Sequence, residues 1–485
     1  MKRSKFNLSH YKLLTANPGY LVPLTWYEAL PGDTIQHQTG LMLRLSPLVA
    51  PIMHPMRVRL HHWFVPNRLI WEDWEDFITG GDDGLDASVH PFISTDDLTS
   101  DTVDESGLLD YLGIMPADYT GNTRTFSALP YRAYMAIYNE YYRDQDLKTA
   151  VSYDVTSGQE TSPSQSCMLC AWEKDYLTTS RAWTQKGTEV TIPVSPETVG
   201  STLPTFTYGS ATENLEILAA QDNVSVKNTT PGTTRDLAWG DPGLMVNIDE
   251  LRLALALGRY QEARAQYGSR YVEYLRYLGV RSSDARLQKP EYLGGGRMSI
   301  QTSEVLRTGN VDADSTNIGD MAGHGIGAGS SKRFRRFFEE HGIVMTMMSV
   351  IPKTIYNNAL HRSFLREDKE DYFQKELQFI GDQEVSNAEV MIDHTGHTAT
   401  FGYQQRYDEY RTLPSSIAGE FRDTMDHWHM ARIFSSDASL NSSFIDCYPT
   451  TRVYASTSTD KLLCLANHSV QARRMLTRYP QKRTI

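Results

Sequence analysis

Hydrophobic and polar residues alternate along residues 56–66 of the chain. A two-residue repeat of this kind predicts a β-strand with one apolar face and one mixed face. Pro66 ends the strand, because proline has no N–H with which to continue a ladder of hydrogen bonds. The apolar face carries Val58, Leu60, His62 and Phe64, and the mixed face carries Arg57, Arg59, His61 and Trp63.

Directly after this strand the apolar residues recur at spacings of three and four. This period predicts an amphipathic helix over residues 67–79, which Gly80 and Gly81 end. Similar patterns predict helices over 129–144, over 248–278 with breaks at Gly258 and Gly268, and over 369–380. Tyrosines at 131, 134, 138 and 141 form a stripe, which we interpret as packing, although a base-stacking surface would share the pattern.

Most of the remaining chain is predicted to be extended. Residues 6–66 combine short alternating segments with turns, and Pro31-Gly32-Asp33 is a strong turn signal among them. Residues 341–351 are nearly all apolar or β-branched, which predicts a strand buried on both faces. Together these patterns predict a mainly β protein, a β-sandwich with long helix- and loop-containing insertions, built for assembly.

The insertions differ in composition. Ser, Thr, Gly, Pro and Asn supply 22 of the 42 residues in 195–236, which predicts a surface-exposed, variable segment. Residues 67–180 are predicted to be a helix-rich insertion, 248–278 a helical insertion and 471–485 a basic C-terminal tail. We expect all of them to belong to one domain that spans residues 1–485.

Charge is segregated along the chain. The net charge is −12, and residues 72–118 hold fourteen Asp and Glu but no Lys or Arg. A body of this kind can still bind phosphate through basic ends, although the ends could equally be solvated tails. The basic residues at the two ends are Lys2, Arg3, Lys5, Arg473, Arg474, Arg478, Lys482 and Arg483.

The chain shows no sign of export or of membrane insertion. No apolar run approaches the roughly 20 residues of a membrane span, and the basic start leads into polar residues, so we expect no signal peptide. The four cysteines argue against a disulfide framework and fit assembly in a reducing cytoplasm.

Candidate catalytic and metal-binding motifs are incomplete. Cys167 and Cys170 form a CxxC without a second ligand pair, so we interpret them as core residues. The histidine pairs at 394/397 and 427/429 lack an HExxH pattern, and no hydrolase or kinase signature is present. We therefore predict no catalytic residue, no metal and no cofactor.

Glycines alternate from Gly323 to Gly329 without the spacing of a phosphate-binding loop. We interpret them as backbone with special dihedral angles that passes close to another part of the protein. A basic, aromatic segment follows, and it suits either single-stranded nucleic acid or a neighbouring subunit, with the subunit contact favoured. Its cationic residues are Lys332, Arg333, Arg335 and Arg336.

Several segments, taken together and in order, resemble the major capsid protein of the Microviridae, and its gokushovirus-like branch most closely. His62-Trp63-Phe64-Val65-Pro66-Asn67-Arg68 is one of them. The resemblance covers most of the chain but lapses over 195–236. The matching segments are 53–55, 62–68, 74–81, 129–134, 139–145, 172–176, 178–181, 183–187, 286–288, 290–296, 319–325, 407–411, 419–423 and 428–432.

The resemblance implies an eight-stranded antiparallel jelly roll that assembles with identical copies into a T=1 icosahedral shell around circular single-stranded DNA. It implies a tailless bacteriophage whose subunits are made and assembled in the host cytoplasm. Further implied partners are a small basic DNA-binding protein, an internal scaffolding protein and a DNA pilot protein. It also implies that 195–236 faces a host receptor, while the basic tail faces the genome.

Two other classes of protein stay open on the residues alone. A β-sandwich enzyme that acts on carbohydrate would need carboxylates, such as those at 408–409 or 423–426, to converge in a cleft. A free-standing nucleic-acid-binding protein would use the same basic residues without assembling. The lead hypothesis is a structural coat subunit without catalytic activity.

Overall fold

The computed structural model of this chain describes residues 3–82, 85–161, 163–188, 190, 248–267, 270–281, 283–285, 287–306 and 321–477. Between 191 and 247 it describes only four short strands, β8 (Phe206–Tyr208), β9 (Ala211–Glu213), β10 (Ser225–Lys227) and β11 (Thr234–Asp236). Contacts divide the chain into two compact units, one formed by Met1–Thr184 with Tyr267–Ile485 and the other by Gln185–Gln266. No described helix is long and apolar enough to cross a membrane.

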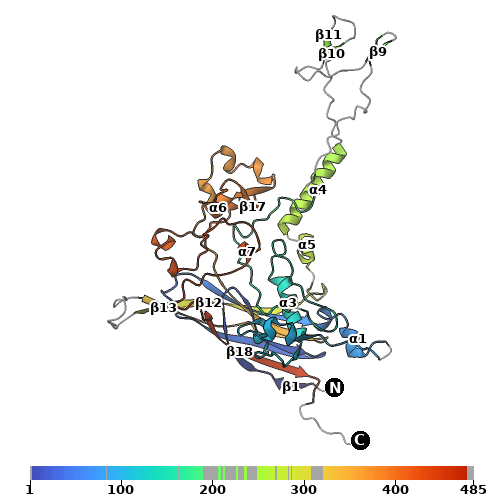
Figure 1. Cartoon of the computed structure of the whole chain (residues 1–485), viewed down its shortest axis with the longest axis vertical. Coiled ribbons are helices and arrows are strands. Elements are labelled where there is room, and N and C mark those ends of the chain that lie inside the picture. Colours follow the sequence, from blue (N-terminus) through green and yellow to red (C-terminus); the bar gives the residue numbers. More distant parts are fainter. Residues whose placement is uncertain are drawn as a thin grey trace. The chain divides into compact units, whose positions relative to one another are not determined.

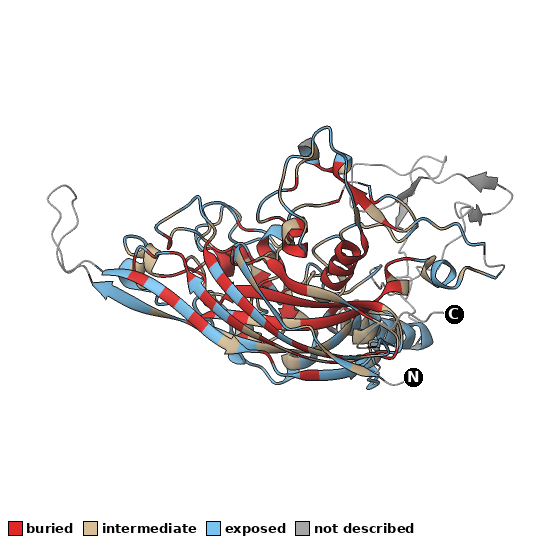
Figure 2. Ribbon diagram, turned by 90° about the horizontal axis from the view of Figure 1, so that it is seen from below, coloured by how far each residue is buried: buried red, intermediate tan, exposed pale blue. Residues whose placement is uncertain are grey.

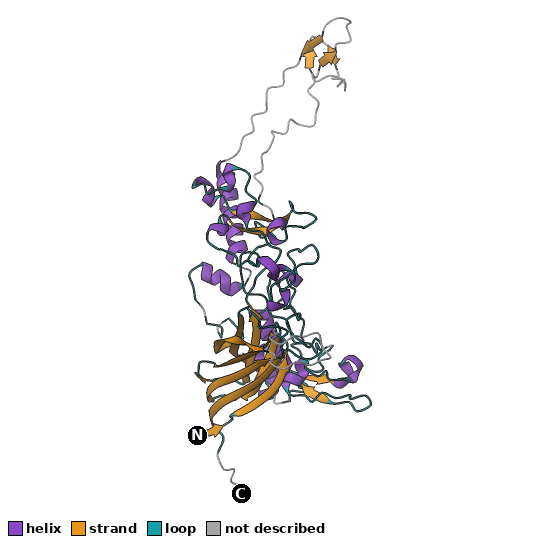
Figure 3. Cartoon of the chain, turned by 90° about the vertical axis from the view of Figure 1, so that its left-hand side faces the viewer, coloured by secondary structure: helices purple, strands orange, loops and turns teal. Residues whose placement is uncertain are grey.

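One large antiparallel sheet dominates the first unit (Figure 3). Its strand order is β1-β18-β4-β13-β12-β5-β15-β3, with β14 paired to β4 and β2 paired to β18. The predicted mainly β fold is therefore confirmed, with ten strands in this sheet. These strands are β1 (Ser4–Asn7), β2 (His10–Ala16), β3 (Leu21–Ala29), β4 (Thr34–Leu45), β5 (Met56–Pro66), β12 (Glu291–Leu306), β13 (Met321–Ser330), β14 (Phe334–Phe337), β15 (Gly342–Pro352) and β18 (Leu462–Arg474).

The long strand β12 makes the sheet double back on itself. Its first part pairs with β5 up to Ile300, and its last part pairs with β13 from Gln301 onward. The sheet therefore has two layers, which we call the covered layer (β3, β5, β15 and the first part of β12) and the open layer (β1, β2, β4, β13, β14 and β18). Side chains of both layers, including Leu43 of β4 and Leu60 of β5, share one hydrophobic core.

Alternating side chains fill this core as the sequence predicts. Val58, Leu60, His62 and Phe64 of β5 are all buried, and so is every residue of β15. The strands of the open layer alternate between buried and exposed positions, which Figure 2 shows as bands of red and pale blue. Pro31-Gly32-Asp33 forms the predicted turn between β3 and β4.

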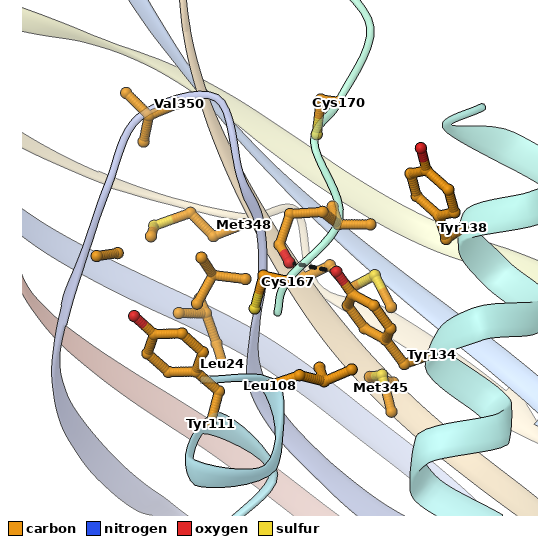
Figure 4. Close-up of a cluster of buried hydrophobic side chains, with 14 of the residues drawn as sticks. Leu24, Leu108, Tyr111, Tyr134, Tyr138, Cys167, Cys170, Met345, Met348 and Val350 are labelled. Carbon is orange, nitrogen blue, oxygen red and sulfur yellow. Dashed lines mark hydrogen bonds between the residues drawn. The ribbon is translucent and has the colours of Figure 1, made fainter. Parts of the chain in front are cut away.

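Helices lie over the covered layer. The helices α2 (Leu108–Leu112) and α3 (Leu129–Tyr141) contact β3, β5 and β15. Tyr134 of α3 donates a hydrogen bond of 2.7 Å to the carbonyl oxygen of Leu21 and lies near Met345 of β15 (Figure 4). Tyr131, Tyr134 and Tyr138 are buried, so the interpretation of the tyrosine stripe as packing is confirmed. Cys167 and Cys170 also lie in this core (Figure 4).

Two predicted helices were wrong because tertiary hydrogen bonds interrupt them. Residues 67–79 form a 3₁₀ turn (Asn67–Leu69) and the short helix α1 (Trp74–Thr79), since the amide of Glu72 bonds to the carbonyl of Val155 instead of a helical carbonyl. Residues 369–380 form two 3₁₀ turns, Lys369–Asp371 and Glu376–Phe379, and the Tyr407 hydroxyl accepts the amide of Gln374 between them.

The predicted helix over 248–278 forms in two pieces, α4 (Ile248–Tyr267) and α5 (Tyr271–Tyr277). Gly258 lies inside α4 and does not break it, while Gly268 is outside the described residues. The remaining elements are β6 (Phe92–Ser94), β7 (Thr125–Ser127), β16 (Asp382–Ser386), β17 (Thr400–Gln405), α6 (Asn387–Val390) and α7 (Ser442–Ile445). A small separate core that includes Val385, Phe401 and Phe444 lies beneath β16 and β17.

The alternating glycines of β13 face the interior. A side chain at Gly323 would lie 2.7 Å from the backbone oxygen of Ala50, and one at Gly325 would lie 2.5 Å from Leu45. Close approach is therefore confirmed as the reason for these glycines. The predicted special dihedral angles are wrong, because none of the glycines in β13 has a positive φ.

Gly323→Ala is expected to lower the free energy of unfolding by about 1–3 kcal/mol, because the backbone of Ala50 and Pro51 cannot yield as a flexible side chain can. Gly258→Ala is the matched control, since no atom lies within 4 Å of the added Cβ in helix α4. That variant should be neutral or gain up to about 1 kcal/mol. Urea-denaturation midpoints of the two variants test the contrast, and equal midpoints would contradict it.

Four histidines meet between the two layers. His37 of β4 lies with its ring centroid 4.7 Å from that of His62 and 5.5 Å from that of His468, and His10 stacks on His468 at 4.9 Å. Their partners are hydroxyl groups, including Thr39, Ser331 and Thr346. Burial, together with positive charge on neighbouring histidines, lowers the pKa of His37 to about 2 and those of His62 and His468 to about 3.

This cluster predicts acid sensitivity of the folded subunit. His37, His62 and His468 accept protons near pH 6.5 in the unfolded chain and only near pH 2–3 in the folded one. Their contribution to stability is therefore complete above about pH 6.5 and is lost as the pH falls, with an uptake of about three protons by these groups on unfolding near pH 4.5. Denaturant unfolding followed between pH 7.5 and about pH 4.5 measures the total uptake, to which His54 and His61 add, because burial lowers the pKa of each to about 4.

His468→Asn should reduce the proton uptake by about one, because it removes one titrating group from the cluster. His397→Asn at an exposed position is the control, because it removes a histidine and leaves the buried cluster intact. A stability that does not fall below pH 6 would contradict the assignment of neutral histidines to this core.

Candidate nucleic-acid interface

The fold brings the two predicted basic clusters onto one sheet. β1 pairs with β18, so that Lys5 faces Arg473, and β14 pairs with β4 next to them. The N-terminal, C-terminal and 331–338 segments are therefore neighbours in the open layer, as Figure 1 shows for β1 and β18. Lys2, Arg478, Lys482 and Arg483 lie outside the described residues.

Strand register decides which cations face outward. Residues that pair directly across antiparallel strands lie on the same face of the sheet. Lys5, Arg473, Thr34 and Phe337 form one exposed row, and Asn7, Gln471, Gln36 and Arg335 form the next on the same face. A third row holds Ser469 and Gln38. Arg333 donates a hydrogen bond of 3.2 Å to the side chain of Gln38. We call these three rows of residues the basic rows.

Two further cations add to the exposed side of these rows. The guanidinium of Arg3 lies 5.0 Å from the ring centroid of Phe337, and Lys332 is exposed just before β14. Among the described residues no carboxylate forms an ion pair with Lys5, Arg335 or Arg473. These cations are therefore available to a ligand from outside the subunit.

The other two predicted cations are held in ion pairs within the subunit. Arg474 forms an ion pair of 3.0 Å with Asp33, which is fully buried, and burial is the main cause that raises the pKa of that carboxyl group. Arg336 forms an ion pair of 2.8 Å with Glu291 of β12. The alternation of residues 462–474 carries this signal already, because Arg474 shares the parity of the buried Val470 and Ala472.

The six strands of the open layer contain no acid, and the last part of β12, which pairs with β13, adds only Glu304, on the same side of the sheet as Gly323. The six strands β1, β2, β4, β13, β14 and β18 hold seven Lys and Arg and no Asp or Glu. The whole chain has 59 acidic and 47 basic residues, so this layer reverses the overall balance. A face without carboxylates presents no repulsion to a phosphate backbone.

Apolar residues continue the same face beyond the basic rows, and the sequence analysis missed them. The next rows are Tyr11, Asn467, Gly40 and Ser330, then Leu13, Leu465, Met42 and Ala328, then Thr15, Leu463, Arg44 and Ile326. We call these three the apolar rows. Residues of the last two rows, including Leu13, Met42 and Leu463, line a hollow of about 430 Å³. Both faces of residues 462–466 are apolar, so alternation alone gives no sign of which face is exposed.

A cavity of about 780 Å³ is lined by Glu389 and Glu409 among others, but it does not offer a pair of free carboxylates. Glu389 is held by Tyr176 at 2.6 Å and by Arg362 at 2.9 Å, and Glu409 accepts a hydrogen bond of 2.7 Å from Gln383. Both carboxylates are thus committed to structural bonds, which does not favour general acid–base chemistry. No described group of His, Cys, Asp and Glu could hold a metal ion.

These features describe a β-sandwich protein whose open layer is left for contact with other molecules. Comparison with known proteins gives the family. The model of the capsid protein (F protein) family matches residues 1–482, and the chain belongs to this family.

Relatives that are named as capsid proteins support this family assignment. The chain is 31% identical to capsid protein VP1 of Bdellovibrio phage phiMH2K, over 92% of this chain and 88% of that protein. It is 29% identical to capsid protein VP1 of Chlamydia phage 1 and 27% identical to that of Spiroplasma virus 4, over 92% and 91% of this chain and 89% and 87% of those proteins. The resemblance to the Microviridae and to their gokushovirus-like branch is thereby confirmed, and the chain is a major capsid protein of such a phage, a component of the virion.

Proposed function

We propose that this capsid subunit contacts packaged single-stranded DNA through the basic rows of its open layer. The observation that carries the proposal is the absence of Asp and Glu from the six strands of that layer in a chain of net charge −12. Packaging requires neutralisation of phosphates without reading of sequence, and exposed Lys and Arg supply it. The tail residues Arg478, Lys482 and Arg483 lie outside the described residues and remain predicted DNA contacts.

The subunit assembles with identical copies into the shell that its family implies. We propose for that shell a closed T=1 icosahedron of jelly-roll subunits, formed in the cytoplasm of the bacterial host, without catalytic activity of its own. The helices on the covered layer would then lie on the side away from the DNA. The small basic DNA-binding protein, the internal scaffolding protein and the DNA pilot protein remain predicted partners.

Replacing Lys5, Arg333, Arg335 and Arg473 together by Gln should leave shells intact but lower their DNA content, because these outward cations are not needed for the core. The salt dependence of DNA binding should become shallower by about 0.7 per lost phosphate contact. DNA content follows from the ratio of absorbance at 260 and 280 nm of purified particles.

A second quadruple variant controls for net charge by removing exposed cations elsewhere, at Lys369, Arg411, Arg252 and Lys353. It should retain its DNA. Arg474→Gln should instead lower subunit stability, because it leaves the buried Asp33 without its partner. Unchanged DNA content in the first variant would overturn the proposed contact.

We further propose that residues 195–236 face the host receptor, on their composition and their position in the sequence. Shortening this segment is expected to spare assembly and to reduce adsorption to host cells, because a surface insertion supports no core. Particle yield and an adsorption assay on the same preparation separate the two effects. Loss of assembly would assign the segment to a contact within the shell.

A further inference from the structure

The proposed DNA contact uses the basic rows and assigns no role to the neighbouring apolar rows. Tyr11 is 71% exposed and Leu13 is 70% exposed, although both lie in a regular strand. Leu463, Leu465, Met42 and Ile326 are exposed beside them. Removing apolar surface from water is favourable, so a patch of this kind marks a binding surface. The covered layer shows the contrast, because α2 and α3 close its outer side.

Continuity with the basic rows identifies the chemistry of the occupant. β4 crosses the entire face, and its outward residues Thr34, Gln36 and Gln38 belong to the basic rows while Gly40, Met42 and Arg44 belong to the apolar rows. Two residues of strand separate one row from the next, or about 7 Å. One elongated ligand can therefore touch both sets of rows.

The apolar rows themselves contain no carboxylate either, and the nearest one is Asp460, which accepts a hydrogen bond from Thr15 in the last row. Arg44 lies in the last of them, next to Leu463 and Ile326. The ligand that fits is a polyanion that also presents apolar surface. Single-stranded nucleic acid has this composition, because its unpaired bases expose their faces while its backbone carries one charge per nucleotide.

We propose that the apolar rows form a platform for unpaired bases, with Tyr11 stacking on a base and Leu13, Leu465 and Met42 packing against base faces. Phosphates of the same strand lie on the basic rows and at Arg44. The inference rests on the proposed function and deepens it, because it assigns the bases as well as the phosphates to this face. Such contacts are tolerant of sequence, as packaging of a whole genome requires.

The test compares binding of a 15-nucleotide oligothymidine and of an abasic strand of the same length to the full-length subunit, by fluorescence anisotropy. The wild-type chain should bind the oligothymidine about tenfold more tightly, since both strands carry the same charge and only one carries bases. Leu13→Ser with Leu465→Ser should remove most of that difference and leave binding of the abasic strand unchanged.

Two controls separate this inference from the proposed function. Leu413→Ser removes an apolar side chain that is 88% exposed outside the sheet, and it should change neither affinity. Lys5→Gln with Arg473→Gln should weaken the binding of the oligothymidine and of the abasic strand by the same factor. Equal wild-type affinity for the two strands overturns the base platform while leaving the phosphate contacts standing. Failure of both strands to bind overturns the proposed function together with the platform.

Loss of shell assembly in the Leu13/Leu465 variant, with its preference for oligothymidine retained, would instead assign the apolar rows to a protein contact and overturn the inference.

A measurement on intact wild-type particles needs no variant. After irradiation at 254 nm, the tryptic peptide of residues 6–12, which contains Tyr11, should carry a cross-linked nucleotide. Cross-links found only on peptides outside the open layer would contradict the proposal.

Discussion

The structure depends on one asymmetry, the burial of only three of the four faces of a two-layered sheet. The inner faces of both layers share a core, and α2 and α3 bury the outer face of the covered layer. The outer face of the open layer keeps its side chains in contact with solvent. Its leucines and its tyrosine therefore add no free energy of burial to the stability of the single chain. A subunit of a shell can carry such a face because other molecules cover it in the assembled particle.

Charge follows the same asymmetry. The chain is acidic as a whole, yet the six strands of the open layer hold no carboxylate, and two of their cations, Arg474 and Arg336, are paired with Asp33 and Glu291. Lys5 and Arg473 point outward in one row, and Arg335 points outward in the next row on the same face. Residues separated by more than 460 positions in the sequence, such as Lys5 and Arg473, thereby act as one surface.

Local patterns predicted a large part of the fold. The two-residue period predicted β5, the nearly continuous apolar run of 341–351 predicted β15, and Pro31-Gly32-Asp33 predicted the turn between β3 and β4, because these signals depend on neighbours in the sequence. The break in the predicted helix over 67–79 could not be foreseen from local patterns. It depends on the hydrogen bond from the amide of Glu72 to the carbonyl of Val155, which is a tertiary contact. The basic clusters were predicted separately, and only strand pairing shows that they form one site. The apolar rows depend on which layer the helices cover, and no local pattern contains that information.

The most direct test of this account is a map of the assembled particle that resolves the strands of one subunit. The account predicts that the open layer faces the interior, with density for nucleic acid against Lys5, Arg473 and the apolar rows, while α2 and α3 lie on the opposite side. An open layer that faces the exterior, or that is covered entirely by a neighbouring subunit, would contradict it.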